Sequence, residues 1–249
     1  MNRTIVPQPP KEERKSGKKE QMRKLFDGIA PSYDRLNHLF SLHIDRLWRR
    51  RAVRMVSAHA PRRILDLATG TGDLAIGLAR RLPEATIVGV DLSEQMLEIG
   101  RRKVERASLA KQVTLVAGDA EQLTFGEGEL DVVTVGFGVR NFARLDHVLT
   151  EMFRVLRPGG VLVILELTTP PNRLIRWFYE FYSFRFMPLV GGWISHQKAA
   201  YRYLPASVRA FDTPEQLLER MRKAGFESVE VRSQTGGIAH LFSAIKPQK

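Results

Sequence analysis

The sequence predicts an α/β protein built around a doubly wound, mostly parallel sheet of seven strands. From about residue 61 onward, apolar runs of strand length alternate with amphipathic segments of helix length, as in a sheet wrapped by helices. The strands are apolar on both faces, as at residues 161–165, which indicates burial between two helical layers. Two strands close the chain without a helix between them, and we expect this last pair to be antiparallel.

Turns and helix caps separate the predicted elements. Ser93 is a good N-cap for the helix after the second strand, and Thr213-Pro214-Glu215 caps a late helix. The turn Pro158-Gly159-Gly160 is expected to end a helix over residues 143–156. Another helix is expected over residues 74–82. Strands are expected over residues 63–67, 85–90, 113–117, 130–137, 161–167, 226–231 and 238–245.

Additional segments flank and interrupt this core. Residues 1–17 are polar and rich in Lys, Arg and Pro, which predicts a disordered basic tail. Residues 18–60 are expected to form an N-terminal helical cap that is broken at Pro31. Residues 61–249 form the main domain, with an aromatic and basic insertion at about 170–210.

Composition excludes several kinds of chemistry. The chain has no Cys, so disulfides, thiolate metal sites and cysteine nucleophiles are absent. No run approaches the roughly 20 apolar residues that span a bilayer, and the N-terminal region lacks the apolar segment of a secretory signal. We expect a cytoplasmic protein, with peripheral contact at the cytoplasmic face of the membrane as an alternative. The net charge of +12 fits nucleic acid, an anionic membrane surface, or solubility alone.

The first motif with chemical meaning is the turn Asp66-Leu67-Ala68-Thr69-Gly70-Thr71-Gly72-Asp73, which follows the first strand. Glycines here let the backbone approach a ligand closely and present the amides of a helix N-terminus. Asp91 ends the second strand, 21 residues after Gly70, where a carboxylate can accept both hydroxyls of a ribose. A tight turn and a capping Asp would explain each feature alone, but together they favour a nucleoside site.

The acidic residues distinguish between two kinds of nucleoside cofactor, a dinucleotide and S-adenosylmethionine. A dinucleotide site has a similar spacing, and Gly70-x-Gly72-x-x-Ala75 fits its looser form. Asp66, however, would repel a pyrophosphate, whereas a carboxylate suits the cationic S-adenosylmethionine. Asp119 and Ala120 end the third strand, where they can contact the adenine edge. The expected cofactor residues are therefore Asp66, Gly70, Thr71, Gly72, Asp91, Asp119, Ala120 and Gly136, with no metal ligand.

These motifs resemble the class I S-adenosylmethionine-dependent methyltransferases, which have a Rossmann-like fold. The resemblance is carried by the D-x-A-x-G-x-G loop, by Asp91, by Asp119-Ala120 and by the turn Arg157-Pro158-Gly159-Gly160. The chain departs from the common pattern at Ala68, where that family usually has glycine.

Segments outside this core resemble the ubiquinone/menaquinone biosynthesis C-methyltransferases, from about residue 25 to the C-terminus. Residues 33–48 and 154–168 resemble two family signatures, with Arg157 for the usual Lys and Thr168 for the usual Ser. The resemblance implies methyl transfer from S-adenosylmethionine to a ring carbon of demethylmenaquinol, or of both naphthoquinols and benzoquinols. Two shorter matches are Gly136-Phe137-Gly138-Val139-Arg140-Asn141 and Tyr201-x-Tyr203-Leu204-Pro205-x-Ser207.

The chemistry of a quinol acceptor points to three candidate catalytic residues. A ring carbon becomes nucleophilic when the neighbouring hydroxyl, with a phenolic pKa near 10, loses its proton. Arg140 could stabilise that phenolate or order a proton-accepting water, since its guanidinium is not itself a base at neutral pH. A structural ion pair is the alternative for Arg140. His43 and Tyr201 are proton-relay candidates, although a lone His is more often structural.

The aromatic stretch at residues 177–186 is too apolar for a plain surface helix, and Arg173, Arg176 and Arg185 argue against a pure core. We expect a lid over the active site that also admits a prenyl tail from the membrane. The basic segment with Arg49, Arg50 and Arg51 fits either attraction of anionic lipid or an ordinary solvated face.

Three rival functions fit the sequence less well, and the first of them is a nucleic-acid methyltransferase. A cytosine-C5 methyltransferase needs a Cys, and enzymes that methylate exocyclic amines usually carry N/D-P-P-Y/F where this chain has Gly136-Phe137-Gly138. An NAD(P)-dependent reductase is disfavoured by Asp66. A methyl-transfer assay would separate the third rival, a cofactor-binding protein without catalysis. We expect a prenylated quinol as substrate and no nucleic acid, and the sequence leaves a homodimer open.

Overall fold

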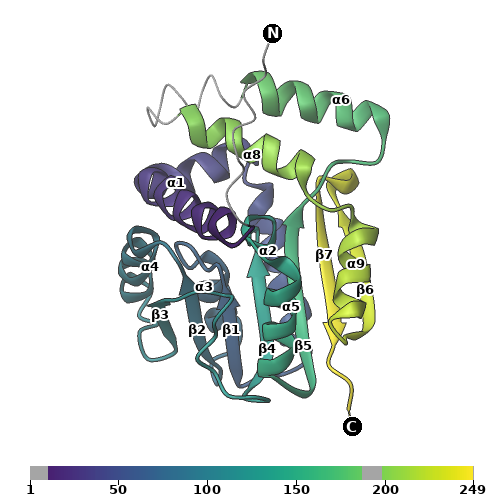
Figure 1. Cartoon of the computed structure of the whole chain (residues 1–249). Coiled ribbons are helices and arrows are strands. Elements are labelled where there is room, and N and C mark those ends of the chain that lie inside the picture. Colours follow the sequence, from purple (N-terminus) through teal and green to yellow (C-terminus); the bar gives the residue numbers. More distant parts are fainter. Residues whose placement is uncertain (1–10, 187–197, 249) are drawn as a thin grey trace.

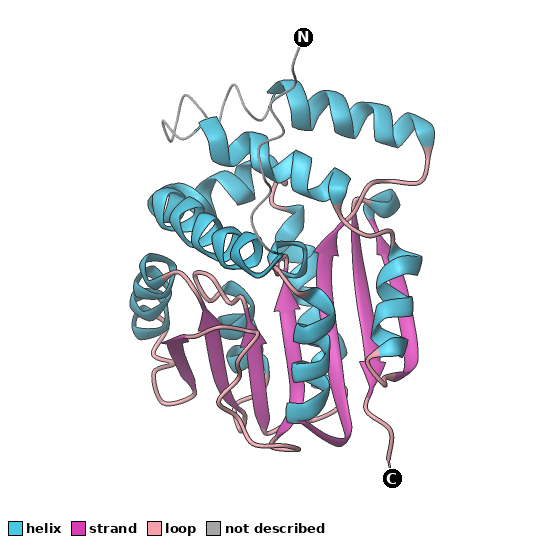
Figure 2. Ribbon diagram, viewed as in Figure 1, coloured by secondary structure: helices cyan, strands magenta, loops and turns pink. Residues whose placement is uncertain are grey.

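The computed structural model describes residues 11–186 and 198–248, whose strands form one seven-stranded sheet flanked by helices (Figures 1 and 2). The strand order is β3-β2-β1-β4-β5-β7-β6. The first five strands are parallel, and β7 runs antiparallel to both β5 and β6. The strands are β1 (Arg63–Leu67), β2 (Thr86–Asp91), β3 (Val113–Ala117), β4 (Leu130–Gly136), β5 (Leu156–Leu167), β6 (Glu227–Gln234) and β7 (Ala239–Ile245).

This architecture confirms the predicted doubly wound sheet with an antiparallel end. Ser93 caps its helix by accepting the N–H of Met96, and Thr213 forms a capping box with Gln216. The helices are α1 (Lys11–Phe40), α2 (Ile44–Ser57), α3 (Asp73–Arg81), α4 (Glu94–Arg106), α5 (Leu145–Val155), α6 (Arg173–Phe181), α8 (Lys198–Ala210) and α9 (Pro214–Lys223), with short helical turns η1 (Val139–Asn141), η2 (Tyr182–Phe186) and η3 (Thr235–Gly237).

The central strands β1, β4 and β5 bury side chains on both faces, because successive side chains point to opposite sides of a sheet that helices cover on each side. On β1, Ile64 packs with residues of α2, α3 and α4, whereas its neighbour Leu65 packs with residues of α5 and α9. Figure 1 shows α5 and α9 on the near face of the sheet and α2 and α3 behind it. This two-sided burial explains why the strand sequences are continuously apolar.

The predicted helix break at Pro31 is wrong. Helix α1 runs without interruption from Lys11 to Phe40, so residues 11–17, which were expected in the tail, are helical. Apolar residues on both sides of the proline pack in one cluster against Met96, among them Ile29, Ala30 and Leu36. This shared packing opposes the cost of a proline inside the helix. The chain turns later, at Leu42 and His43, which both have positive φ.

The turn at Pro158 also differs from the prediction. Helix α5 ends at Val155, and β5 begins directly at Leu156, so Pro158, Gly159 and Gly160 lie within an irregular first part of the strand. The pairing of β4 with β5 shifts register between Leu130 and Val132, and regular pairing resumes at Val161. The glycine turn therefore starts the strand and does not terminate the helix.

The predicted helical cap and the described parts of the predicted lid lie together above the carboxyl ends of the parallel strands, whereas residues 187–197 of the lid lie outside the described residues. Helices α1, α6 and α8 gather at this end of the molecule (Figure 1). Leu204 of α8 packs in the cluster formed by α1 and α4. Because the loops that follow parallel strands emerge at this edge, any ligand bound there would be enclosed between the sheet and these helices.

Candidate functional site

A first cavity, which we call the strand-end cavity, lies at the carboxyl ends of β1 to β4 and encloses about 80 Å³. Loops that follow the four strands form its floor, and α1 forms its roof. It receives one predicted residue from the loop after β1, one from the end of β2, two from the end of β3 and one from β4. These residues are Gly70, Asp91, Asp119, Ala120 and Gly136.

Asp91 is held in a fixed orientation by the backbone. Its carboxylate accepts the N–H of Gly70 at 2.8 Å and the N–H of Ser93 at 2.9 Å. Gly70 has a φ of +56°, which a residue with a side chain rarely adopts. Burial raises the pKa of Asp91, although these backbone hydrogen bonds oppose the shift. The result is an oriented carboxylate at the tip of β2, beside a turn that exposes its backbone.

Asp66, Thr71 and Gly72 do not line the strand-end cavity, although the sequence placed them with the cofactor residues. Asp66 is 1% exposed and accepts the hydroxyls of Thr69 and Thr134, each at 2.7 Å. Burial raises its pKa to about 6. Thr71 donates its hydroxyl to Asp34, and Gly72 begins α3. In the structure these three residues support the loop from outside the cavity.

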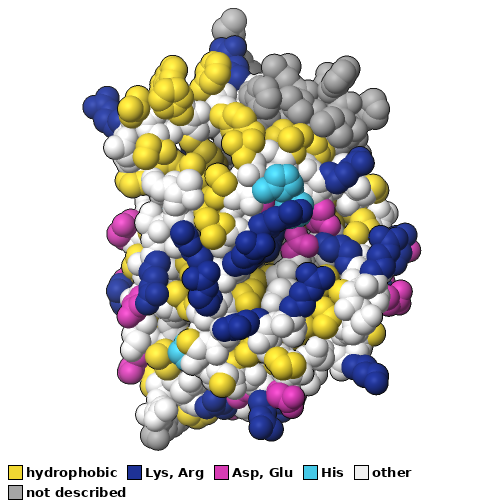
Figure 3. Space-filling view, turned by 180° about the vertical axis from the view of Figure 1, so that it is seen from behind, with side chains coloured by type: hydrophobic (Ala, Val, Ile, Leu, Met, Phe, Trp, Pro, Cys, Tyr) yellow, Lys and Arg dark blue, Asp and Glu magenta, His cyan; other side chains and the backbone are white. Residues whose placement is uncertain are grey.

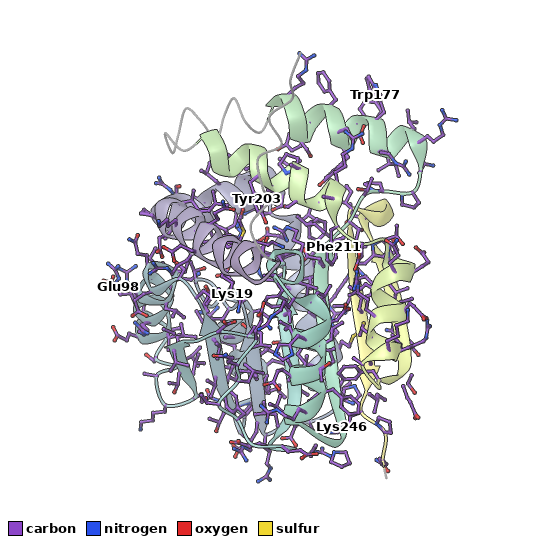
Figure 4. All side chains as sticks on the ribbon, viewed as in Figure 1. Lys19, Glu98, Trp177, Tyr203, Phe211 and Lys246 are labelled. Atoms are coloured by element: carbon purple, nitrogen blue, oxygen red, sulfur yellow. The ribbon has the colours of Figure 1, made fainter. Side chains whose placement is uncertain are left out.

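The amino-terminal part of α1 crosses the strand-end cavity and was not foreseen as part of it. Lys19 Nζ lies 2.7 Å from Asp119 Oδ2 and 2.6 Å from Glu121 Oε2. The next lysine along the helix anchors the same segment, since Lys18 Nζ donates to the carbonyl of Phe142 at 3.0 Å. Figure 4 shows Lys19 on α1 close to the ends of the strands. The carboxylate expected to contact adenine is thus paired with a cation of the chain itself.

A second cavity, the cap cavity, encloses about 370 Å³ between α1, α2, α6, η2 and α8. Its walls are mostly aromatic and aliphatic, with a smaller number of polar groups that include Arg49, Arg140 and Tyr203. Three residues line both cavities, Phe26, Tyr33 and Phe137, so the two spaces meet at these side chains. The apolar part of the cap cavity is lined by Leu25, Ile29, Phe40, Leu42, Ile44, Trp48, Leu167, Ile175, Phe178, Leu204 and Ile238.

Arg140 lines the cap cavity and forms a buried ion pair with Glu166. Its side chain is 6% exposed, and Nη1 lies 2.5 Å from Oε1 of Glu166, which is fully buried. Nη1 also donates to the carbonyl of Phe137, and Nε donates to Ser207 Oγ at 3.2 Å. Burial opposes the charge of the guanidinium, but Glu166 outweighs burial and raises the pKa of Arg140. Arg140 therefore stays a fixed cation.

The other two predicted catalytic residues are placed differently. His43 is exposed and lines neither cavity, and its ring stacks on His38 with centroids 5.7 Å apart. It adopts a left-handed conformation before α2, which turns its side chain to the surface. Tyr201 belongs to α8, but its side chain lies outside the described residues.

Several residues that sequence reasoning did not assign to the site lie at its centre. Tyr33, expected only as part of the cap, lines both cavities, and burial raises the pKa of its hydroxyl. Asn141 lines the strand-end cavity, and its Oδ1 accepts the hydroxyl of Tyr203 at 2.9 Å. Glu166 had a readable signal, since an acid within an otherwise apolar buried strand needs a partner of opposite charge.

The basic segment of α2 is not uniformly solvated. Arg49 is paired with Asp45, lies 5.1 Å above the ring of Phe137 and lines the cap cavity. Arg51 donates to Gln234, and Arg50 is exposed. Within the described ranges, three or more His, Asp or Glu side chains do not group in a way that could hold a metal ion.

Comparison with known proteins gives matches over most of the chain. A demethylmenaquinone methyltransferase of Thermus thermophilus is 48% identical over 223 residues, covering 90% of this chain and all of that protein. A ubiquinone/menaquinone biosynthesis C-methyltransferase UbiE of Geobacter sulfurreducens is 44% identical over 233 residues, covering 93% of this chain and 91% of that protein. These relatives are of the same length class as this chain.

Solved structures match at the level of the fold. A phosphoethanolamine N-methyltransferase 2 of Haemonchus contortus, crystallised with S-adenosyl-L-methionine, superposes with a TM-score of 0.56 and 21% identity. The match covers 75% of this chain and 49% of that one. The model of the ubiE/COQ5 methyltransferase family matches residues 14–246. The chain therefore belongs to the ubiE/COQ5 methyltransferase family.

Proposed function

We propose that this protein transfers a methyl group from S-adenosylmethionine to a ring carbon of demethylmenaquinol, giving menaquinol. The observation that carries the proposal is the meeting of two chemically different cavities at Phe26, Tyr33 and Phe137. One is lined by carboxylates and exposed backbone, and the other is apolar and aromatic. A charged nucleoside and a prenylated ring would each find matching surroundings, with their reacting groups at the junction.

The strand-end cavity suits S-adenosylmethionine, whose sulfonium supplies an electrophilic methyl group. Asp91 presents an oriented carboxylate for ribose hydroxyls, and Asp119 lies where an adenine edge would be contacted. The volume of about 80 Å³ is below the roughly 300 Å³ of a small-molecule site. Because Lys19, Met22 and Phe26 of α1 line this space, we expect the amino-terminal part of α1 to move when the donor binds.

In the cap cavity, Arg140 is the residue we assign to the acceptor. A fixed cation beside a quinol hydroxyl favours its anionic form, and that anion makes the neighbouring ring carbon nucleophilic. Nε and Nη1 of Arg140 are bonded within the protein, which holds the guanidinium in place in the wall of the cavity. The raised pKa of Arg140 means that the phenolic proton passes to another group or to water.

We assign the prenyl chain to the apolar part of the cap cavity and to α6. Phe178 lines the cavity and is also 57% exposed, so an apolar path leads from the surface inward. Leu174, Trp177 and Phe181 of the same helix are at least 59% exposed, and Figure 4 shows Trp177 pointing away from the body of the molecule. Exposed aromatic residues in such a cluster are typical of a surface that contacts lipid.

The surroundings of α6 fit contact with the headgroups of a membrane. Figure 3 shows hydrophobic side chains gathered at this end of the molecule, with Lys and Arg side chains on the face below them. Helix α2 lies behind the sheet in Figure 1, on the side that Figure 3 shows, and its Arg46, Arg50 and Arg54 are exposed. Within the described residues, no helix has both the length and the apolar character to cross a bilayer. We therefore propose peripheral contact through α6.

The naphthoquinol is preferred over a benzoquinol because the Thermus relative, at 48% identity, is named for demethylmenaquinone alone. The Geobacter relative is named for both quinones, so the benzoquinol is the second candidate. The test supplies purified protein with methyl-labelled S-adenosylmethionine and either a short-chain demethylnaphthoquinol or the corresponding benzoquinol. Label in the naphthoquinol alone supports the proposal, label in both supports the dual enzyme, and label in neither refutes it.

A further inference from the structure

Helix α8 contacts the turn η1 through two hydrogen bonds that are one helical turn apart. The hydroxyl of Tyr203 donates to Oδ1 of Asn141 at 2.9 Å, and Oγ of Ser207 accepts from Nε of Arg140 at 3.2 Å. Residues four apart lie on the same face of a helix, so α8 presents both groups toward η1 together. Ser207 is itself held, because it donates to the carbonyl of Leu204 at 2.8 Å.

The two residues of η1 that α8 holds belong to different cavities. Arg140 lines the cap cavity, where the acceptor is placed, whereas the next residue, Asn141, lines the strand-end cavity. Tyr203 lines the cap cavity as well. Its hydroxyl thus reaches from the wall of one cavity to a side chain in the wall of the other.

The turn η1 is packed so tightly that it would transmit a displacement and not absorb it. Val139 is 1% exposed, and a Cβ added at Gly138 would lie 2.5 Å from Cβ of Ala68, in the loop after β1. The backbone N–H of Arg140 is also bonded to Glu166 at 3.2 Å. A shift of η1 would therefore move the donor loop, since close-packed elements have few intermediate arrangements.

We propose that Tyr203 and Ser207 are positioning residues that couple the two cavities, so that a ring bound in the cap cavity strengthens binding of the donor. An acceptor ring that contacts α8 fixes Tyr203, Tyr203 fixes the side chain of Asn141, and Asn141 then faces the donor in one orientation. The inference rests on the proposed function for the identity of the two ligands. It adds that the binding of one ligand changes the affinity of the protein for the other.

The test measures the affinity of the demethylated donor, S-adenosylhomocysteine, by titration calorimetry with and without saturating 2-prenyl-1,4-naphthoquinone. Neither compound can react, so binding is read without turnover. For the unmodified protein we expect an affinity ratio of about fivefold or more, and linkage requires the same ratio when the order of ligands is reversed. In Tyr203→Phe the ratio should fall to near one, because the bond to Asn141 is lost while the ring is kept.

Two further variants complete the design. Tyr179→Phe removes a hydroxyl from the same cavity. That hydroxyl bonds Ser183, and no hydrogen bond joins it to η1 among the described residues, so the ratio should be kept even if quinone affinity changes. Ser207→Ala removes the bond to Arg140 and should lower the ratio partly, which provides a second readout if Tyr203→Phe folds poorly.

The outcomes separate the two proposals. If the unmodified protein does not bind S-adenosylhomocysteine, the proposed function fails and the inference fails with it. If S-adenosylhomocysteine binds but the ratio is one, or the ratio is unchanged in both Tyr203→Phe and Ser207→Ala, the coupling is refuted and the proposed function stands. A loss of the ratio in Tyr179→Phe to the same extent would also refute a specific role for Tyr203.

Discussion

The two cavities are built in different ways from the same chain. The floor of the strand-end cavity comes from the loops that follow β1 to β4, within residues 68–143. The walls of the cap cavity come from segments as distant as Leu25 and Ile238. The first depends on backbone geometry at strand ends, whereas the second depends on how helices pack over them. With each ligand measured alone, we expect substitutions in the first to act on donor affinity and those in the second to act on the acceptor.

Arg140→Ala should give the largest effect and should act on the acceptor side alone. We expect turnover to fall by about 100- to 1,000-fold, as when one electrostatic stabiliser of a developing anion is removed. The affinity for S-adenosylmethionine, measured by calorimetry, should change little. Because Glu166 would be left buried without its partner, the free energy of unfolding should also fall, by about 3–5 kcal/mol.

Arg140→Lys keeps the charge and separates these two effects. It should restore most of the stability but little of the turnover, since an ammonium cannot make the bonds to Glu166, Phe137 and Ser207 at once. Normal turnover in Arg140→Ala would show that Arg140 has no part in the reaction, and normal turnover in Arg140→Lys would show that the charge suffices without these bonds.

Asp91→Asn should act on the donor side alone. One oxygen that now accepts a backbone N–H would become an amide nitrogen facing another donor, and the negative charge would be lost. We expect the dissociation constant for S-adenosylmethionine to rise by about 10- to 100-fold in calorimetry. Glu98→Gln, on the exposed side of α4, is the matched control. An unchanged constant in Asp91→Asn would remove this carboxylate from the donor site.

The buried carboxyl group of Asp66 should make the stability of the protein depend on pH. It accepts the hydroxyls of Thr69 and Thr134, and burial raises its pKa to about 6, from 3.8 in the unfolded chain. The folded state therefore binds this proton more tightly, and stability falls as pH rises from about 4 to about 6. The contribution of Asp66 to the fall should be about 3 kcal/mol.

Urea unfolding of the native protein and of Asp66→Asn between pH 4 and pH 8 measures this contribution as a difference between the two. The free energy of unfolding of the variant should not fall between pH 4 and pH 6. Above pH 6 the variant should be more stable relative to the native protein than it is at pH 4. Parallel curves for the two proteins would contradict a raised pKa at Asp66.

Trp177→Ala tests whether the outer face of the lid contacts lipid. Trp177 is 59% exposed, stacks on Phe181 and meets Phe178 edge-on, so its removal disrupts the exposed aromatic cluster. We expect binding to vesicles of phosphatidylcholine and phosphatidylglycerol to weaken by about tenfold in a sedimentation assay. Val116→Ala, at an exposed apolar position on β3, should bind as the native protein does. Equal loss in both variants would argue against contact through α6.

Lys19→Gln should give the smallest effect, on the rate of donor binding. The ion pairs of Lys19 with Asp119 and Glu121 are partly exposed, so removing them should speed association of S-adenosylmethionine by about two- to fivefold in stopped-flow measurements. The difference should shrink at high salt. Lys24→Gln on the same helix, where Lys24 is paired with Glu20 at the surface, should leave the rate unchanged. Equal rates for Lys19→Gln and the native protein would mean that α1 does not control access.

Local sequence signals were sufficient wherever the structure depends on neighbouring residues. Ser93 and Thr213 cap the helices that their spacing indicated, because a cap is decided within four residues. Five of the eight predicted cofactor residues line the strand-end cavity, because parallel strands bring their carboxyl ends to one edge. The prediction that Asp66 lies at that edge is correct, but its side chain is buried and does not reach the cavity. The position of a residue along a strand end does not tell whether its side chain points into the core or into a cavity.

The sequence alone determined the fold class, the order of the elements and the acidic strand ends. The spacing of apolar residues, the helix caps and the turn glycines that indicate them all act over short distances along the chain. Tertiary structure decided the rest: that α1 continues through Pro31, that Lys19 crosses to Asp119, and that Tyr203 meets Asn141. These depend on contacts between residues 62 or more positions apart, or on packing that outweighs a local preference. Such contacts are fixed only when the whole core forms, so no local pattern records them.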